Sequence, residues 1–259
     1  MIPNKDLRFR IARMVRESGE GHIPSSFSII DIIHELYSNV LRVDPGDPDW
    51  VDRDYFILSK GHGAAALYVV LCEQGFISEV DLINYGTKEG ILGGHPDVTT
   101  VPGVEASTGS LGHGFPTAIG TSLGLRIQGR ANRVFCLVGD GECHEGTIWE
   151  SANVAANLQL GNLCVIVDWN GSAAQLMPID DVPAKWRAFG WRVYEVDGNS
   201  PEELKTLFES LDFEAIGDPV AVVARTTKGK GVSMLEGHGR WHHRIPDDEE
   251  WQIIEQELT

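Results

Sequence analysis

The chain has 259 residues, 29 of them glycine, and a formal net charge of −17 at pH 7. That length suffices for one α/β domain, so we expect residues 1–259 to form a single domain with a tail from about residue 232. The negative charge argues against nucleic acid or an anionic membrane as a partner. No apolar run approaches the length of a membrane span, and residues 1–20 lack the apolar centre of a signal peptide.

The four cysteines show no CxxC spacing. Cys136 and Cys164 fall inside two apolar runs, where we expect reduced, buried thiols. The expected compartment is the cytoplasm.

Hydrophobic periodicity predicts helices alternating with strands along the chain. The expected helices span 5–18, 28–40, 64–74, 78–85, 115–128, 145–160, 180–189 and 201–211. The expected strands span 55–58, 134–138, 163–167, 191–196 and 219–224. Continuous apolar strands separated by helices indicate a buried parallel sheet, whose strands all end at one carboxyl edge. Such sheets bind ligands at that edge.

Two of these strands end in side chains that carry oxygen. Asp140, between two glycines, follows the strand 134–138, and Asn170 follows the strand 163–167. Glycines let backbone N–H groups approach an anion closely, and carboxylate and amide oxygens suit Mg²⁺. The local hypothesis is a metal-bridged diphosphate. The alternative is that Gly-Asp-Gly is only a tight turn.

The same residues resemble a known family. Gly-Asp-Gly followed by an Asn at this distance resembles the thiamine diphosphate signature, and GDGECHEG with Trp149 and Glu150 just after it resembles transketolase. The resemblance covers nearly the whole chain and implies a doubly wound, mostly parallel α/β sheet with helices on both faces. It also implies that the side chains of Asp140 and Asn170 and the main-chain carbonyl of Ser172 hold Mg²⁺, with Ca²⁺ or Mn²⁺ as substitutes, on the diphosphate of thiamine diphosphate. The cofactor-binding residues that it implies in this turn are Gly139, Asp140, Gly141 and Glu142.

Four segments that carry histidines also resemble transketolase motifs. They read GHIPSSFSIIDIIHELY, SKGHG, GHP and, in the tail, WHHRIP. The resemblance implies that His22 and His95 lie near substrate, whereas His62 and His242 reach both the diphosphate and the substrate. Taken alone, a histidine in a Gly/Pro loop is more often a surface residue. Because imidazoles titrate near neutrality, such a cluster supplies hydrogen-bond donors without a generally basic surface.

Three further features complete the resemblance. The segment TGSLGHG resembles a motif whose main-chain atoms, here those of Gly109 and Leu111, meet the aminopyrimidine ring of the cofactor. Glu145 matches a glutamate that reaches the dimer interface and joins a proton relay, although it could also be a simple acid at a helix N-terminus. The loop 225–231 resembles the family's KTxxGxG, although its lysines could equally belong to a solvated loop.

Some positions depart from the family pattern or suggest another chemistry. Three successive residues rarely share one metal, so we reject a zinc site in the Cys-His-Glu run at 143–145. The loop 171–175 lacks the compact spacing common after the metal-binding Asn, so Ser172 is the least secure ligand. The other departures are Pro24-Ser25-Ser26, His113 and His243, and the roles of the two histidines stay open.

The resemblance covers a diphosphate-binding domain alone. Transketolases carry the carboxylate that faces the aminopyrimidine in a second domain, so we expect a second subunit with the pyrimidine-binding and C-terminal domains in an α2β2 assembly. The leading hypothesis is the cofactor-anchoring subunit of a transketolase that transfers a two-carbon ketol unit from a ketose to an aldose. The alternatives are the α chain of a 2-oxo acid dehydrogenase, which SKGHG and GHP disfavour, a 1-deoxyxylulose-phosphate-synthase-like enzyme and a non-catalytic homologue. The sugar stays open between phosphorylated, sulfonated and dephosphorylated forms.

Overall fold

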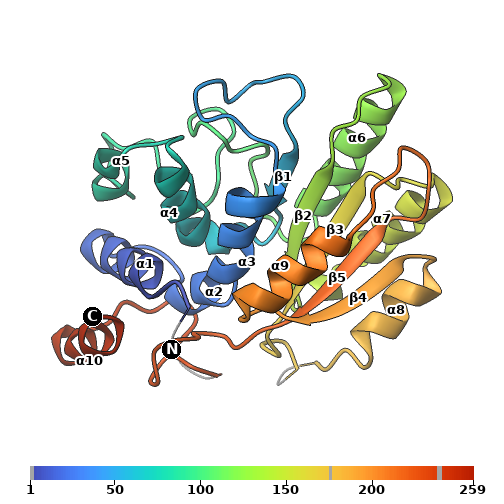
Figure 1. The fold of residues 1–259 in the computed structure, drawn as a ribbon. Helices are drawn as coiled ribbons and strands as arrows, with labels where there is room; N and C mark the ends of the chain where they lie inside the picture. The colour runs from blue at the N-terminus through green and yellow to red at the C-terminus, as the bar shows by residue number, and fades with distance from the viewer. Residues whose placement is uncertain (1–2, 175–176, 238–240) are drawn as a thin grey trace.

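The structure is a computed structural model that describes residues 3–174, 177–237 and 241–259 (Figure 1). Within these residues, five parallel strands form one sheet in the order β1-β2-β3-β5-β4. The strands are β1 (Tyr55–Leu58), β2 (Val134–Gly139), β3 (Leu163–Trp169), β4 (Arg192–Asp197) and β5 (Val220–Arg225). The predicted parallel sheet is confirmed.

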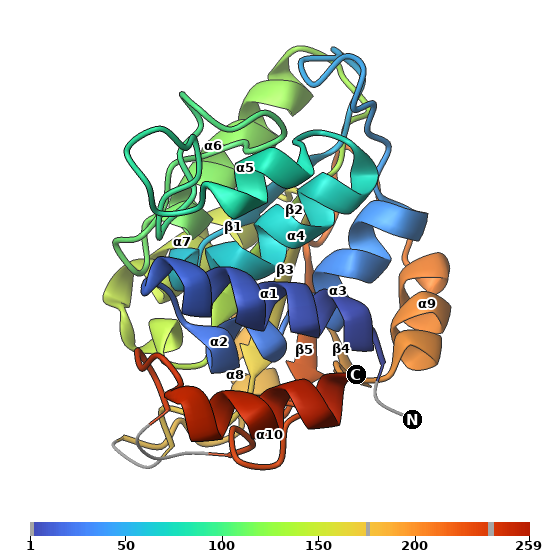
Figure 2. The same ribbon diagram turned by 90° about the vertical axis from the view of Figure 1, so that its left-hand side faces the viewer.

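Helices cover both faces of the sheet (Figures 1 and 2). One face carries α1 (Lys5–Ser18), α2 (Ile23–Phe27), α3 (Ile30–Glu35), α4 (Ala64–Gln74) and α9 (Pro201–Ser210). The other carries α6 (Gly114–Ile127), α7 (Gly146–Asn157) and α8 (Val182–Ala188). Two short helical turns, η2 (Gly61–Gly63) and η3 (Glu142–His144), follow β1 and β2, and α5 (Glu79–Ile83) and α10 (Asp248–Leu258) lie further out. This is the expected doubly wound α/β fold.

Each face of the sheet has its own apolar core, because successive side chains of a strand point to opposite faces. In β2, Phe135 and Leu137 pack into the core beneath α1 and α4, whereas Val134 and Val138 pack beneath α6 and α7. The central strands read as unbroken apolar runs because they are buried on both faces. Cys136 and Cys164 are fully buried free thiols, as the sequence predicted.

Two stretches of the chain differ from the sequence-based expectation. The helix expected at 28–40 is divided into α3 and a π-helical turn, η1 (Leu36–Val40), and the loop expected before it contains α2. Pro24 lies in the first turn of α2, where its fixed φ favours a helix start. The tail, for which no element was predicted, ends in α10, whose capping box joins Asp247 and Glu250. None of the helices in the described ranges is long and apolar enough to cross a lipid bilayer.

Candidate active site

The carboxyl ends of β2 and β3 bring Asp140 and Asn170 to one edge of the sheet. Gly139 pairs with Asp168 in the parallel register, and the Asp140 N–H donates to the Asp168 carbonyl at 3.1 Å. Asp140 Oδ2 accepts from the Ala173 N–H at 3.2 Å, while Asn170 Oδ1 accepts from the Ser172 N–H at 2.9 Å. The loop after β3 therefore joins both side chains, and their role as metal ligands stays a prediction.

Both side chains line a cavity of about 600 Å³ at this edge. Of the residues predicted to bind metal, cofactor or substrate, the cavity is lined by His62, Leu111, Gly139, Asp140, Gly141, Glu142, Asn170, Ser172 and His242. Its other lining residues are Ser25, Lys60, His144, Ala173, Met177 and Lys228. Ser25 belongs to the variant Pro24-Ser25-Ser26 segment, so that departure lies on the cavity wall.

Histidines from separate loops lie together beside the cavity, and two of the predicted ones, His62 and His242, line it. The His22 ring lies with its centroid 5.4 Å from that of His62, 5.2 Å from that of His242 and 4.6 Å from that of His243. His243 Nε2 is 3.6 Å from Glu20 Oε1, so this extra histidine bridges the cluster and the end of α1. His95 is exposed and packs its ring against Gly109, where a Cβ would come within 2.9 Å of His95 Cδ2. Gly109 also has φ +145°, so this close approach requires glycine.

Burial keeps two of these imidazoles neutral. The pKa of His22 is lowered to about 4, first by burial and then by the neighbouring His242 and His243. The pKa of His62 is lowered to about 2, again by burial and then by Lys60. His22 Nδ1 is buried and finds no hydrogen-bond partner among the described residues. A neutral ring with an unpaired nitrogen can give a hydrogen bond to a polar ligand or accept one from it.

Two lysines that the sequence analysis did not single out add positive charge to the cavity. Lys60 Nζ lies 2.5 Å from Asp168 Oδ2 in a fully buried ion pair. Lys228 Nζ donates to Ser172 Oγ at 2.7 Å and lies 3.4 Å from His242 Nδ1. Burial and then Lys60 lower the pKa of Lys228. Both lysines belong to segments that the sequence analysis did note, SKGHG and the loop 225–231. They could not be predicted as site residues, because a lone lysine beside glycines is also typical of a solvated loop.

Glu142 and Glu145, both predicted site residues, are placed very differently. The Glu142 carboxylate is buried and accepts from Ser59 Oγ at 2.5 Å and from the N–H groups of Gly112 and Gly139 at 2.8 and 3.1 Å. It thereby ties together the ends of β1 and β2 and the loop before α6, an arrangement typical of a positioning residue. Glu145 is exposed at the start of α7, against Gly112, and is absent from the described lining of the cavity. A proton-relay role would therefore depend on a partner chain.

The cavity fits a metal-bound diphosphate in its chemistry. Burial is the first cause of the raised pKa of Asp140, so a nearby cation would stabilise its charged form. In the described part of the chain, no three His, Cys, Asp or Glu side chains converge as a metal site. A divalent ion would thus depend on Asp140 together with amide and main-chain oxygens, which suits Mg²⁺ with phosphate oxygens as further ligands. Lys228 lines the same cavity and would place a positive charge beside a diphosphate, whereas the charge of Lys60 is paired with Asp168.

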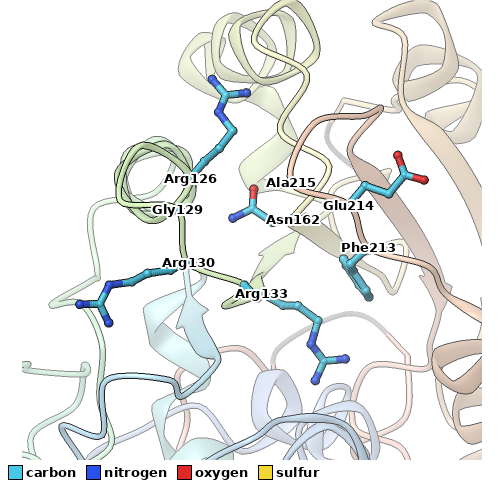
Figure 3. A pocket seen from close by; sticks show the side chains of 9 residues that line it. Arg126, Gly129, Arg130, Arg133, Asn162, Phe213, Glu214 and Ala215 are labelled. Carbon is cyan, nitrogen blue, oxygen red and sulfur yellow. The ribbon is translucent and has the colours of Figure 1, made fainter.

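A smaller cavity at the opposite edge does not offer comparable chemistry. It has a volume of about 230 Å³ and lies before β2, β3 and β5. Figure 3 shows its three arginines, Arg126, Arg130 and Arg133, pointing in different directions. Each donates to a protein oxygen, that of Leu158, Val51 or Asp54. The arginines therefore do not converge on a common ligand.

The fold and the cavity together define a cofactor-binding domain of the thiamine diphosphate class. The family model described as "Transketolase, thiamine diphosphate binding domain" matches residues 4–258, so the chain belongs to that family. It is 36% identical over 257 residues to one of the subunits of the apulose-4-phosphate transketolase of Phocaeicola vulgatus, covering 97% of this chain and 91% of that protein. It is 35% identical over 246 residues to the 6-deoxy-6-sulfo-D-fructose transketolase subunit SqwG of a Clostridium species, covering 93% and 89%.

Solved structures give the same family. Transketolase from Campylobacter jejuni superposes with a TM-score of 0.90 at 29% identity, over 97% of this chain and 41% of that one. Transketolase from Leishmania mexicana gives a TM-score of 0.89 at 28% identity, over 98% of this chain and 40% of that one. The chain therefore spans about two-fifths of these transketolases, although it matches almost the full length of the separate transketolase subunits.

Proposed function

We propose that this chain is the thiamine diphosphate-binding subunit of a two-chain transketolase, which transfers a two-carbon ketol unit from a ketose to an aldose. The observation that carries the proposal is the single cavity in which Asp140 and Asn170 meet His62 and His242, with His22 beside them. The relatives of nearly equal length, which are named as single subunits of transketolases, support it. In this proposal, residues 1–259 act as one cofactor-binding domain.

In this proposal the metal and the diphosphate bind in the cavity, against the ends of β2 and β3. The side chains of Asp140 and Asn170 and the main-chain oxygen of Ser172 hold Mg²⁺, for which Ca²⁺ or Mn²⁺ can substitute. Lys228 neutralises part of the phosphate charge, and the glycines on both sides of Asp140 let backbone N–H groups approach the phosphate. Main-chain atoms of Gly109 and Leu111 meet the aminopyrimidine ring. When bound, the cofactor supplies an electron sink for the carbon–carbon bond chemistry.

The histidines bind the sugar substrate in this proposal. His22, His62, His95 and His242 orient its hydroxyl groups and donate to oxygen atoms on which negative charge develops. His22 and His62 remain neutral at pH 7 because their pKa values are lowered, so each ring can donate from one nitrogen and accept at the other. A chain with a net charge of −17 thus offers a local donor set to an acidic sugar.

A second subunit completes the site. It carries the pyrimidine-binding and C-terminal domains, supplies the carboxylate that faces the aminopyrimidine and assembles with this chain as α2β2. Glu145, exposed at the start of α7, is available to such a partner for a proton relay. The partner reads the far end of the sugar, and the relatives named for apulose 4-phosphate and for a sulfofructose favour a ketose with a phosphate or related acidic group.

The test is to purify this chain together with the product of the neighbouring gene, for which we expect about 300 residues, and to assay the pair with thiamine diphosphate and Mg²⁺. We expect ketol transfer from an acidic ketose by the pair and almost none by either chain alone. Turnover of pyruvate in place of ketoses would instead support the 2-oxo acid dehydrogenase alternative. A pair that binds no cofactor would support the non-catalytic one.

A further inference from the structure

Arg8 and Asp31 form a buried ion pair outside the lining of the cavity. Both side chains have no exposed surface, and Arg8 Nη2 lies 2.6 Å from Asp31 Oδ2. A buried arginine has five N–H donors to satisfy. Arg8 uses them on both Asp31 oxygens and on the carbonyls of Pro3, Phe27 and Lys230. The side chains of the pair are therefore held in one position inside the protein.

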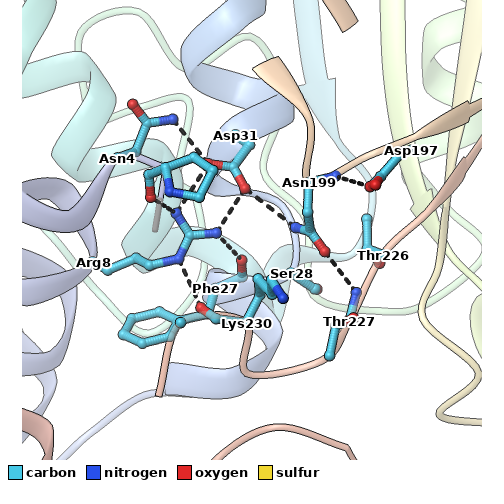
Figure 4. Close-up of polar contacts among 12 residues, drawn as sticks. Asn4, Arg8, Phe27, Ser28, Asp31, Asp197, Asn199, Thr226, Thr227 and Lys230 are labelled. Atoms are coloured by element: carbon cyan, nitrogen blue, oxygen red, sulfur yellow. Dashed lines mark hydrogen bonds and ion pairs between the residues drawn. The ribbon is translucent and has the colours of Figure 1, made fainter. Parts of the chain in front are cut away.

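Two hydrogen-bond paths lead from this pair to the loop after β5 (Figure 4). On one side of Lys228, Asn199 Nδ2 donates to Asp31 Oδ2 at 3.2 Å, and Asn199 Oδ1 accepts from the Thr227 N–H at 2.8 Å. On the other side, Arg8 Nε donates to the Lys230 carbonyl at 2.7 Å. Lys228 thus lies between two backbone groups that are both tied to the Arg8–Asp31 pair.

These two backbone hydrogen bonds help to place the Lys228 side chain in the cavity. Lys228 is only 6% exposed, although a lysine ammonium is strongly hydrated and its flexible stem loses conformational entropy when it is held. Its Nζ donates to Ser172 Oγ in the cavity, where burial disfavours the charged form. Ser172, His242 and the nearby carboxylates of Asp140 and Asp168 favour this position, whereas burial and Lys60 oppose it. The anchored backbone on both sides adds to the local contacts that keep the side chain in the cavity.

We propose that Asn199, with the Arg8–Asp31 pair behind it, is a positioning residue that holds Lys228 in the cavity for an anionic ligand. This inference rests on the proposed function, in which that anion is the diphosphate of thiamine diphosphate. Asn199 does not touch the ligand in this proposal and acts only through Lys228.

The chain provides a matched pair of variants for the test. Asn199→Ala removes the bridge from Asp31 to the Thr227 N–H. Asn4→Gly removes another amide that donates to Asp31, at 2.9 Å; within the described residues, the Asn4 side chain makes no hydrogen bond to the loop after β5. Glycine is the suitable control because Asn4 has φ +46°. The Gly229 N–H still donates to the Pro24 carbonyl in both variants, so the loop keeps one attachment to α2.

The first readout is hydrogen exchange in the full chain without ligand. We expect the amides of 226–231 to exchange about tenfold faster in Asn199→Ala, because a hydrogen bond of ordinary strength is lost, and to be unchanged in Asn4→Gly. Equal exchange in both variants would overturn the anchoring role. This readout stands even if the wild-type chain and its partner together fail to bind thiamine diphosphate, a result that would count against the proposed function alone.

The second readout is the affinity for thiamine diphosphate with Mg²⁺, followed by tryptophan fluorescence in the full chain co-purified with its partner chain. We expect Asn199→Ala to weaken binding about tenfold and Asn4→Gly to leave it unchanged. In a Lys228→Met background, Asn199→Ala should have no further effect, because residues that act through one another are not additive. Additive losses in the double variant, or unchanged affinity in Asn199→Ala, would overturn the proposal.

Discussion

Lys60 and Asp168 form an ion pair beneath the cavity, with Nζ 2.5 Å from Oδ2 and side-chain exposures of 2% and 0%. Ser28 Oγ and Asn170 Nδ2 donate to the same oxygen at 2.7 and 2.9 Å, and Thr226 Oγ1 donates to the other. Asp168 therefore fixes the amide of Asn170 with its nitrogen inward and its oxygen toward Ser172. A residue that does not face the ligand thus orients one of the predicted metal ligands.

Removing the Lys60 ammonium should destabilise the folded chain. We expect Lys60→Met to lower the free energy of unfolding by about 3 kcal/mol, because it leaves a buried carboxylate without its cation. Urea denaturation measures this change. Lys205→Met is the control, since Lys205 pairs with Glu209 at 4.0 Å on the exposed face of α9, where such pairs contribute less than about 1 kcal/mol. Equal losses in the two variants would refute a structural role for the buried pair.

Asp140→Ala should abolish Mg²⁺-dependent binding of thiamine diphosphate, because it removes the only carboxylate proposed as a metal ligand. Titration with and without EDTA, followed by tryptophan fluorescence, separates the metal-dependent part. Asp52→Ala serves as the control, since Asp52 is an exposed carboxylate just before β1, at the far edge of the sheet. An affinity equal to that of the wild type would remove Asp140 from the metal site.

Glu142 should matter for stability as much as for binding. Glu142→Ala leaves Ser59 Oγ and the N–H groups of Gly112 and Gly139 without their acceptor. We expect a loss of about 3 kcal/mol in the free energy of unfolding, since hydrogen bonds to a charged group are the stronger ones. Glu142→Gln keeps one acceptor oxygen and should lose less. Two variants of wild-type stability, with cofactor binding lost, would make Glu142 a direct ligand instead.

The neutral histidines predict a dependence of stability on pH. Their pKa values lie near 4 for His22 and near 2 for His62 in the folded chain, against about 6.5 in the unfolded one. Below about pH 6.5 the unfolded chain binds protons that the folded one does not, so the free energy of unfolding should fall as the pH is lowered toward 4. The raised pKa values of Asp140 and Glu142 act in the opposite direction, since their contribution is present at low pH and lost as the pH rises through those values.

Urea denaturation of a histidine variant and the wild type between about pH 7 and pH 5.5 isolates the histidine contribution, because ordinary carboxylates titrate mainly below this range and Asp140 and Glu142 are present in both proteins. We expect His22→Asn to reduce the slope of the free energy of unfolding against pH. His113→Asn, at an exposed histidine, provides the comparison. A slope that His22→Asn leaves unchanged would mean that this ring is not kept neutral by burial.

The sequence predicted the parts of the molecule that depend on local periodicity. The bounds of α1, β1 and α4 agree with the structure, and the parallel order of β2 and β3 places Asp140 and Asn170 at one edge. The pairing of Lys60 with Asp168 could not be predicted in this way, because 108 residues separate them and neither strand period nor motif connects them. The helix α2 was missed because its five residues are too few to show a helical period.

The exposure of Glu145 also could not be predicted from the sequence. A carboxylate at the start of a helix looks the same whether it faces a cavity, solvent or another chain. Only the packing of α7 against the loop at Gly112 places it outside the described cavity lining. Its proposed role therefore depends on a partner, whereas those of Asp140 and Asn170 do not.

The last helix has a consequence for the histidine cluster. α10 lies against α1 (Figure 2). Arg16 of α1 pairs with Asp248 at 2.7 Å and lies 4.7 Å from the centroid of the Trp251 ring. The short segment that carries His242 runs directly into this helix, with Arg244 bound to Glu250 at 2.7 Å. α10 thus anchors the segment that carries His242. Removing the chain from Asp248 onward should free this segment and lower activity, although α10 itself lies outside the cavity.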